Sequence, residues 1–289
     1  MNNSVKDKIF DAVIFIVILL CVLICILPFF HEIALSFSSN EAAVGRKVLL
    51  WPVQFNFDAY KKVFTDKTML TSLWVTIKMT VIFTLIGMIL TICAAYPLTK
   101  QRLKGRRTLS MIFIFTMYFS GGIIPDYLLV NNLKLLNTEW SLILPLVFSA
   151  YNMIIMKNFF ANIPESLEES ARLDGCSDFG ILTRIVLPLS GPVLATIGLF
   201  LAVGRWNAYQ DALFYITKPK MYPLQLKLYM LVSASQSTET LNDSSSNITL
   251  APEVLKAACI MFATVPILIV YPWVQRYFVS GVMIGAVKG

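Results

Sequence analysis

The sequence has little charge and almost no histidine, and both shortages restrict what the chain can be. Of its 289 residues, 14% are charged and 57% are hydrophobic. Soluble globular chains carry about a quarter charged residues, so this composition excludes an ordinary water-facing surface. His31 is the single histidine, which excludes the H-E-x-x-H pattern of a metalloprotease. No G-x-S-x-G or G-x-G-D pattern of other intramembrane proteases occurs either.

Metal and nucleotide patterns are also missing. Four of the five cysteines fall inside apolar runs, where cysteine packs as a small hydrophobic residue. No grouping of His, Cys and carboxylate residues completes a metal site, so we expect neither disulfides nor a metal. No G-x-x-x-x-G-K-[ST] loop is present. We therefore expect no cofactor and no chemistry on this chain.

What the sequence does have is six long apolar runs. They cover residues 9–30, 70–98, 109–130, 140–159, 189–214 and 255–278. Each is long enough to cross about 30 Å of hydrocarbon as a helix, and lipid forces a spanning segment to satisfy its own backbone groups. The first run is too long for a signal peptide and has no cleavage site. These runs predict an all-α integral membrane protein with six transmembrane helices and a single domain over residues 1–289.

The position of the positive charge predicts the orientation. The net charge is +7, but five basic residues cluster within residues 100–107, between two apolar runs. That is typical of a cytoplasmic loop under the positive-inside rule and argues against a nucleic-acid partner. We therefore predict cytoplasmic N- and C-termini and cytoplasmic segments at 99–108 and 161–184. The segments 31–69, 131–139 and 215–254 then lie outside.

One predicted cytoplasmic stretch, Pro164 to Pro192, has a pattern of its own. Proline and acidic residues at its start favour a helix, and Asp174-Gly175 ends that helix because glycine accepts a positive φ. A second short helix, from Asp178 to Val186, then reaches Leu187-Pro188. The stretch predicts a helix-turn-helix at the inner membrane face, within residues 161–187, with Glu169 and Ser170-Ala171 turned to the cytoplasm.

This pattern resembles the E-A-A-x-x-x-G and I-x-L-P loop of binding-protein-dependent ABC importer permeases. The matching residues are Glu169, Ser170, Ala171, Asp174, Gly175, Leu187 and Pro188. Further resemblance lies in Leu50-Trp51-Pro52, in Ala94 to Leu98, in Gly121 to Pro125 and in the tail from Gln275. These segments are similar to carbohydrate-uptake permeases of the MalG type, and among them to the LplC- and YtcP-like subunits of Gram-positive bacteria.

The resemblance implies a type I importer (MetI-like) permease fold and a set of partners in a bacterial plasma membrane. The chain would form half of a pore with a second homologous permease. Two copies of an ABC ATPase, which hold ATP and Mg, would dock on the 161–187 helix pair. An extracellular solute-binding lipoprotein would deliver an oligo- or polysaccharide. The sugar, its charge and the identity of the partner chains are left open.

Candidate sugar contacts lie in the fifth run. Arg205, Trp206, Asn207, Tyr209, Gln210 and Asp211 supply hydrogen-bonding groups and aromatic faces, and residues four apart would share a helix face. Gly204, Ala208 and Ala212 would give a small-residue packing face. The alternative is that Trp206 and Tyr209 belong to the interfacial belt, with Arg205 and Asp211 paired or snorkelling. Lys78 and Asn152 are further candidates.

Other interpretations stay open. An importer half for a non-sugar solute would carry a similar cytoplasmic loop, and a channel or intramembrane enzyme is the alternative of a different class. The Ser-rich stretch 233–247 predicts either a floppy outer loop or one that becomes ordered on contact with an outside partner.

Overall fold

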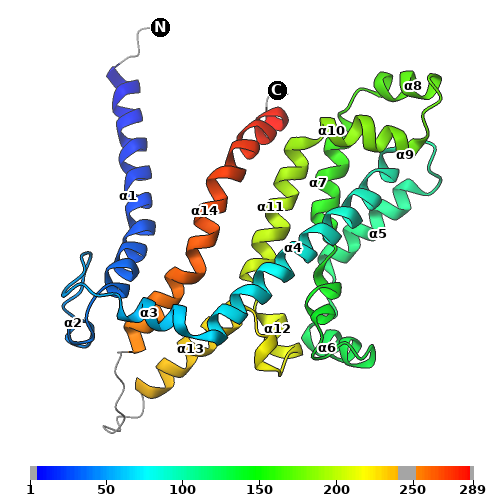
Figure 1. The fold of residues 1–289 in the computed structure, drawn as a ribbon. Helices are drawn as coiled ribbons and strands as arrows, with labels where there is room; N and C mark the ends of the chain where they lie inside the picture. The colour runs from blue at the N-terminus through cyan, green and yellow to red at the C-terminus, as the bar shows by residue number, and fades with distance from the viewer. Residues whose placement is uncertain (1–4, 240–251, 287–289) are drawn as a thin grey trace. The chain divides into compact units, whose positions relative to one another are not determined.

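A computed structural model describes residues 5–239 and 252–286, and it is helical over most of that length (Figure 1). The long helices are α1 (Val5–Ser36), α4 (Lys67–Ala95) and α14 (Pro252–Ala286). The others are α2 (Asn40–Val44), α3 (Asp58–Thr65), α5 (Arg106–Tyr118), α6 (Ile123–Asn132), α7 (Ala150–Ala161), α8 (Glu165–Leu173), α9 (Asp178–Ile181), α10 (Leu187–Leu189), α11 (Gly191–Asn207), α12 (Gln210–Tyr215) and α13 (Leu224–Glu239). The described residues contain no strand.

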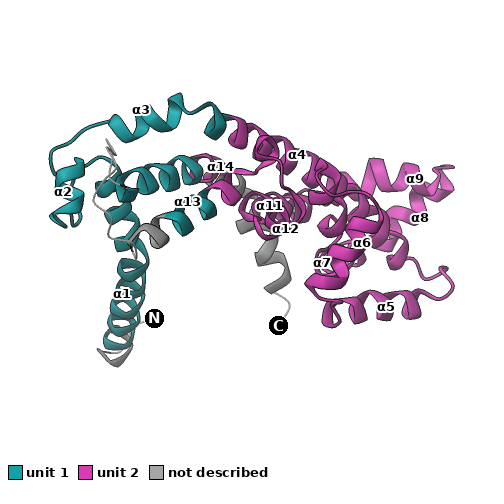
Figure 2. Cartoon of the chain, turned by 90° about the horizontal axis from the view of Figure 1, so that it is seen from below, with its two compact units in different colours: residues 1–70, 228–265 teal, residues 71–227, 266–289 magenta. Residues whose placement is uncertain are grey.

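The chain divides into two compact units, which Figure 2 colours separately. One unit comprises residues 1–70 and 228–265, and the other comprises residues 71–227 and 266–289. Helices α4 and α14 each begin in the first unit and end in the second. The single domain expected from the sequence stays a prediction. Residues 233–239 of the Ser-rich stretch lie in α13, whereas residues 240–247 fall outside the described residues.

Three helices are long and apolar enough to cross a membrane unaided. They are Ile9–Ser36, Lys67–Thr99 and Pro252–Val270, and they match the first, second and sixth apolar runs. Three bent helix pairs raise the number to six if each pair counts as one span, with bends of 112°, 52° and 83°. The all-helical membrane fold is thus confirmed, but half of its spans are broken.

The breaks correct the predicted third, fourth and fifth spans. The run 109–130 is interrupted between α5 and α6, where Gly122 has a φ of 88°. The run 140–159 is α-helical only from Ala150, because short 3₁₀ turns around Pro145 precede it. The run 189–214 divides into α11 and α12, since Ala208 is extended (ψ 131°). Apolar composition gave the lengths of these runs but carried no signal for the turns inside them.

The main core of the second unit joins α4, α7, the segment after α9, and α11. Its most buried side chains include Met79, Met156, Ile181 and Ile197. A polar contact fixes the start of α13 to the same body: the buried Thr76 hydroxyl of α4 accepts a hydrogen bond from the Leu224 backbone N–H at 2.8 Å. The first turn of a helix has N–H groups without an intrahelical partner, so Thr76 caps α13 from another helix.

We predict that Thr76→Val destabilises the protein while Thr76→Ser does not. Valine keeps the shape but leaves the buried Leu224 N–H without an acceptor, at a cost of about 1–3 kcal/mol. Thermal unfolding in detergent should show a lower midpoint for the valine variant alone. Equal midpoints for the two variants would contradict the capping role.

Candidate functional site

The α8–α9 segment is a short helix pair with a glycine turn, as the sequence predicts. Helix α8 follows directly after Pro164 and ends at Leu173. Gly175 has a φ of 81°, in the left-handed region that residues with a Cβ resist. The turn is closed by two backbone bonds, from the Gly175 N–H to the Arg172 carbonyl at 3.0 Å and from the Cys176 N–H to the Ala171 carbonyl at 2.9 Å. The geometry therefore favours glycine at position 175.

The second arm extends farther than the sequence predicts. Ser177 caps α9, its hydroxyl accepting from the Gly180 N–H at 3.2 Å. The chain then continues as a π-helical turn (Leu182–Val186) and α10, so the arm ends at Leu189 instead of Val186. Pro188 lacks the N–H that would bond to the Arg184 carbonyl, which explains the wider turn. The whole arm, Asp178–Leu189, meets α11 at 83°.

A network of ion pairs ties this helix pair to the basic segment after α4. The Glu168 carboxylate bonds to the Lys100 ammonium, and both side chains are largely buried, at 11% and 14% exposure. Arg172 lies 3.8 Å from Glu168 and 3.6 Å from Asp178. Arg102 bonds to Asp178 in turn, and that hydrogen bond raises the pKa of the Arg102 guanidinium. Three cations and two carboxylates thus join two segments almost 70 residues apart.

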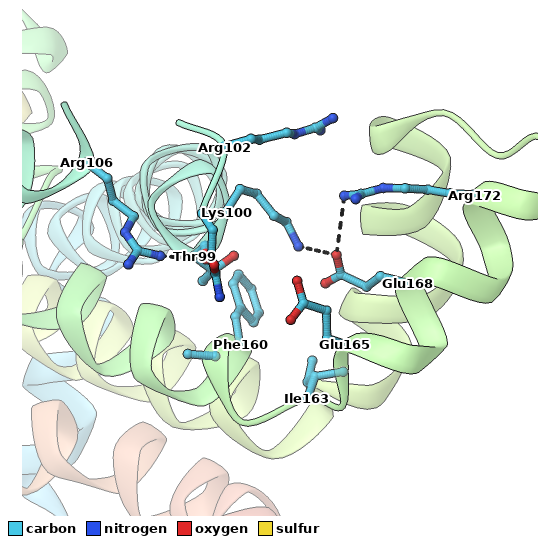
Figure 3. A pocket seen from close by; sticks show the side chains of 11 residues that line it. Thr99, Lys100, Arg102, Arg106, Phe160, Ile163, Glu165, Glu168 and Arg172 are labelled. Carbon is cyan, nitrogen blue, oxygen red and sulfur yellow. Dashed lines mark hydrogen bonds and ion pairs between the residues drawn. The ribbon is translucent and has the colours of Figure 1, made fainter. Parts of the chain in front are cut away.

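A pocket of about 390 Å³ lies between these two segments (Figure 3). The side chains of Lys100, Glu165 and Glu168 point into it, while Arg106 reaches the Thr99 carbonyl at 3.1 Å. The Lys100 ammonium also lies 4.2 Å from the centre of the Tyr96 ring. Because Lys100 and Glu168 are paired with each other across the two segments, the arrangement is suited to fixing the helix pair in place.

The turn of the helix pair presents a different set of side chains. Glu169 and Ser170 are exposed, Leu173 is 90% exposed and Phe179 is 75% exposed. Ala171 is buried at 7% exposure and faces the body. Asp174 and Gly175 form the turn, and Leu187 and Pro188 lie at the far end beside α11. Two large apolar side chains on a charged turn form a surface suited to contact with another protein.

Several participants were not named as site residues from the sequence, among them Lys100, Glu168, Leu173 and Phe179. Glu168 carried a usable signal, because Arg172 lies four residues farther along the same predicted helix. Leu173 and Phe179 also carried one, as large apolar residues on both sides of a glycine turn in a polar stretch. The pairing of Glu168 with Lys100 depends on tertiary structure and had no local signal.

The candidate sugar contacts of the fifth run are divided by the break at Ala208. Arg205 and Asp211 are buried, with side chains 2% and 7% exposed, and they form an ion pair. Arg205 Nη2 lies 3.3 Å from Asp211 Oδ1. Arg205 Nη1, which bonds to the other carboxylate oxygen, also donates to the Leu142 carbonyl at 2.8 Å. The predicted four-residue pairing of faces, Arg205 with Tyr209 and Asn207 with Asp211, is therefore wrong. The Gly204, Ala208 and Ala212 face is interrupted in the same way.

The remaining candidates lie in varied surroundings. Trp206 is nearly buried beside an apolar groove, Asn207 and Gln210 are exposed, and Tyr209 is half-buried. The Asn207 side chain accepts a bond from Gln225 at 3.4 Å. Lys78 donates to both carboxylate oxygens of Glu139, at 2.7 and 2.8 Å, and Asn152 is buried. The structure thus brings Arg205 to Asp211 but gathers no common cluster of these side chains.

The fold and the helix pair together define the class: a multi-span membrane permease with a projecting helical loop between two of its spans. The chain belongs to the family described as binding-protein-dependent transport system inner membrane component, whose sequence profile matches residues 1–284.

Two proteins of Bacillus subtilis are similar to this chain along its whole length. The polygalacturonan/rhamnogalacturonan transport system permease protein YtcP of Bacillus subtilis is 44% identical over 99% of this chain and 100% of its own length. Protein LplC of the same organism is 44% identical over 100% of this chain and 98% of its own. The crystal structure of a bacterial ABC transporter for import of the acidic polysaccharide alginate contains a chain of similar fold, with a TM-score of 0.87, 34% identity and coverage of 96% and 99%. The resemblance stated from the sequence motifs is confirmed.

We predict that Gly175→Val strains the turn and that Gly175→Asn is tolerated. A β-branched residue at a φ of 81° costs of the order of 1–2 kcal/mol, whereas asparagine visits this region more readily. Limited proteolysis of the α8–α9 segment in detergent should become faster in the valine variant only. Equal cleavage rates in both variants would contradict the strained-turn assignment.

We predict that Arg205→Ala is far more damaging than the loss of an exposed pair. Removing Arg205 leaves Asp211 charged and buried and the Leu142 carbonyl without its donor, which costs about 3–5 kcal/mol. The matched control is Lys61→Ala, which removes an exposed pair with Asp58 and should change stability by less than about 0.5 kcal/mol. Unfolding midpoints in detergent distinguish the two, and similar midpoints would show that the Arg205 pair is not needed.

Proposed function

We propose that this chain is the permease subunit of an ATP-driven, binding-protein-dependent importer of an oligo- or polysaccharide, and that it forms half of the translocation pore. The observation that carries the proposal is the exposed turn of the α8–α9 helix pair, with Glu169, Leu173 and Phe179, in a chain 44% identical along its length to a polygalacturonan/rhamnogalacturonan transport permease. We place the chain in a bacterial plasma membrane, with both termini and the helix pair on the cytoplasmic side.

The proposed partners follow from what this chain contributes. A second, homologous permease completes the pore, and two copies of an ABC ATPase bind ATP and Mg below it. A solute-binding lipoprotein delivers the sugar from outside. One crystal structure of a bacterial alginate ABC transporter contains a periplasmic protein with an alginate pentasaccharide bound. ATP hydrolysis then belongs to the ATPase, and this chain carries no catalytic residue.

The geometry suits the transfer of force from an ATPase to a span. Leu173 and Phe179 would enter a cleft on the ATPase, and Glu169 would pair with a cation beside it. The ion pairs of Glu168 with Lys100 and of Asp178 with Arg102 hold the helix pair against the residues that follow α4. Because Asp178–Leu189 runs directly into α11, movement of the turn would rotate α11 and change the pore.

The proposed saccharide pathway excludes the buried ion pair of the fifth span. Arg205 and Asp211 neutralise each other inside the chain, so we assign them to holding the shape of the fifth span. Lys78, Asn207 and Gln210 have exposed polar atoms and are the proposed contacts. An acidic sugar would have to compete with Glu139 for Lys78.

We predict that Leu173→Asp and Glu169→Arg release the ATPase while the chain stays folded. A buried charge at an interface is costly, and a reversed charge repels its partner, so each variant should lower ATPase recovery about tenfold or more. The measurement is quantitative mass spectrometry of the tagged chain purified from native membranes in mild detergent. Ser166→Asp, at the other end of α8, adds the same charge and should leave recovery unchanged.

Two results would contradict the proposal. One is recovery of the wild-type chain without an ABC ATPase under any nucleotide condition, which would favour a channel or enzyme. The other is equal loss of the ATPase in the Ser166→Asp control, which would show that negative charge anywhere on α8 is disruptive. Binding of a non-sugar solute by the co-purified binding protein would instead favour the alternative cargo.

A further inference from the structure

The segment between α2 and α3 folds back along the end of α1. Arg46 and Gln54 both have positive φ values, of 51° and 54°, and they mark the two ends of the returning stretch, residues 47–53. The Ser39 N–H donates to the Val53 carbonyl at 3.1 Å, and the Asn56 N–H donates to the Phe37 carbonyl at 2.9 Å. The stretch is therefore a closed loop held at its base by main-chain bonds.

His31 fixes the tip of this loop beside α1. Its Nδ1 lies 2.7 Å from the Leu49 carbonyl oxygen, and because the carbonyl can only accept, this nitrogen carries the proton. Val48 is buried at 6% and packs against Ala34 of α1 and Ala42 of α2. The loop, which runs beside the end of α1 in Figure 1, thus has a small core of its own.

The residues after Val48 face away from that core. Leu49 is 76% exposed, Leu50 is 42% exposed and Trp51 is 82% exposed. Phe55 and Phe57 add two more exposed rings, at 59% and 52%, which stack around Phe37. Arg46 and Lys47 are exposed at the start of the same stretch. This loop buries Val48 but leaves Leu49 and Trp51 exposed, so these two side chains are available to a second apolar phase outside the chain.

The depth of the loop identifies that phase. The apolar part of α1, Ile9–Ser36, has no buried residue in its most apolar window, and its 28 residues span about 42 Å. The hydrocarbon core is about 30 Å thick, so about 6 Å of helix projects at each end if the helix is centred. His31 lies five residues before Ser36, about 7.5 Å along the helix. The tip of the loop is therefore level with the boundary between acyl chains and headgroups.

We propose that residues 45–57 form a membrane-interface anchor, in which Trp51 and Leu49 insert between phospholipids and His31 holds the loop at that depth. Tryptophan prefers this zone because its ring is apolar and its N–H is polar. Arg46 and Lys47 complement the lipid phosphates. The anchor is continuous with the exposed apolar surface of α1, and its depth at the boundary between acyl chains and headgroups favours lipid over a protein partner as its occupant. The role of His31 is positional.

The test is photocrosslinking from position 51 in the full chain within native membranes. Trp51→p-benzoylphenylalanine is irradiated, the chain is digested, and the peptide is analysed for phospholipid adducts and for linked protein. Phe15→p-benzoylphenylalanine, exposed within α1, is the positive control. Leu173→p-benzoylphenylalanine, on the turn after α8, is the negative control. We expect lipid adducts at positions 51 and 15 and none at 173.

His31 variants make the test specific for the loop geometry. His31→Ala removes the donor to Leu49 and should reduce the lipid adduct at position 51 about fivefold, the population change that follows from losing one hydrogen bond. His31→Gln retains a donor and should restore it. Crosslinks from position 51 to another protein, or no adduct at all, would overturn the proposal. Failure of the importer assignment would leave these adducts unchanged, so the two proposals fail separately.

Discussion

The constraint on which the structure depends is that lipid offers no hydrogen bond to a backbone group. An unbroken helix such as α4 meets it by itself. At the break before α7, Arg205 of α11 donates to the Leu142 carbonyl. Outside the spans, polar side chains act in the same way: Thr76 caps the Leu224 N–H at the start of α13, and the Asn137 side chain accepts from the Thr217 N–H at 2.7 Å. Each of these contacts fastens together two segments that are distant in the sequence.

The same fastening explains how a flexible chain could transmit force. A span that is broken near Ser190 and again at Ala208 would bend under load if nothing held its ends. The Arg205–Asp211 pair bridges the second break. The Arg102–Asp178 pair holds the arm before the first break against the residues that follow α4. With both ends held, the remaining freedom is a rotation of the arm and α11 together, which is the movement that the proposed coupling requires.

Much of this could be predicted from the sequence, and the failures have physical causes. Hydropathy located all six runs because the cost of lipid exposure acts on every residue of a span. The turn at Gly175 was predictable because one backbone angle allows few residue types. The breaks inside runs were not located by hydropathy, although Gly122 and Pro145 are residue types that interrupt helices. The pairing of Lys100 with Glu168 depends on long-range packing. The pairing of Arg205 with Asp211 was one of the two interpretations that the sequence left open, and the structure favours it over sugar contact because Arg205 bonds to that carboxylate and to the Leu142 carbonyl.

The central claim is that this chain carries saccharide inward at the expense of ATP, and uptake by reconstituted vesicles tests it most directly. The purified complex is placed in liposomes with ATP enclosed on the ATPase side, and a labelled saccharide that the binding protein retains is added outside with that protein. The account predicts accumulation above the external concentration that stops when either ATP or the binding protein is omitted. Uptake that only equilibrates the label, and that is indifferent to ATP, would contradict it and would identify the chain as part of a passive pore.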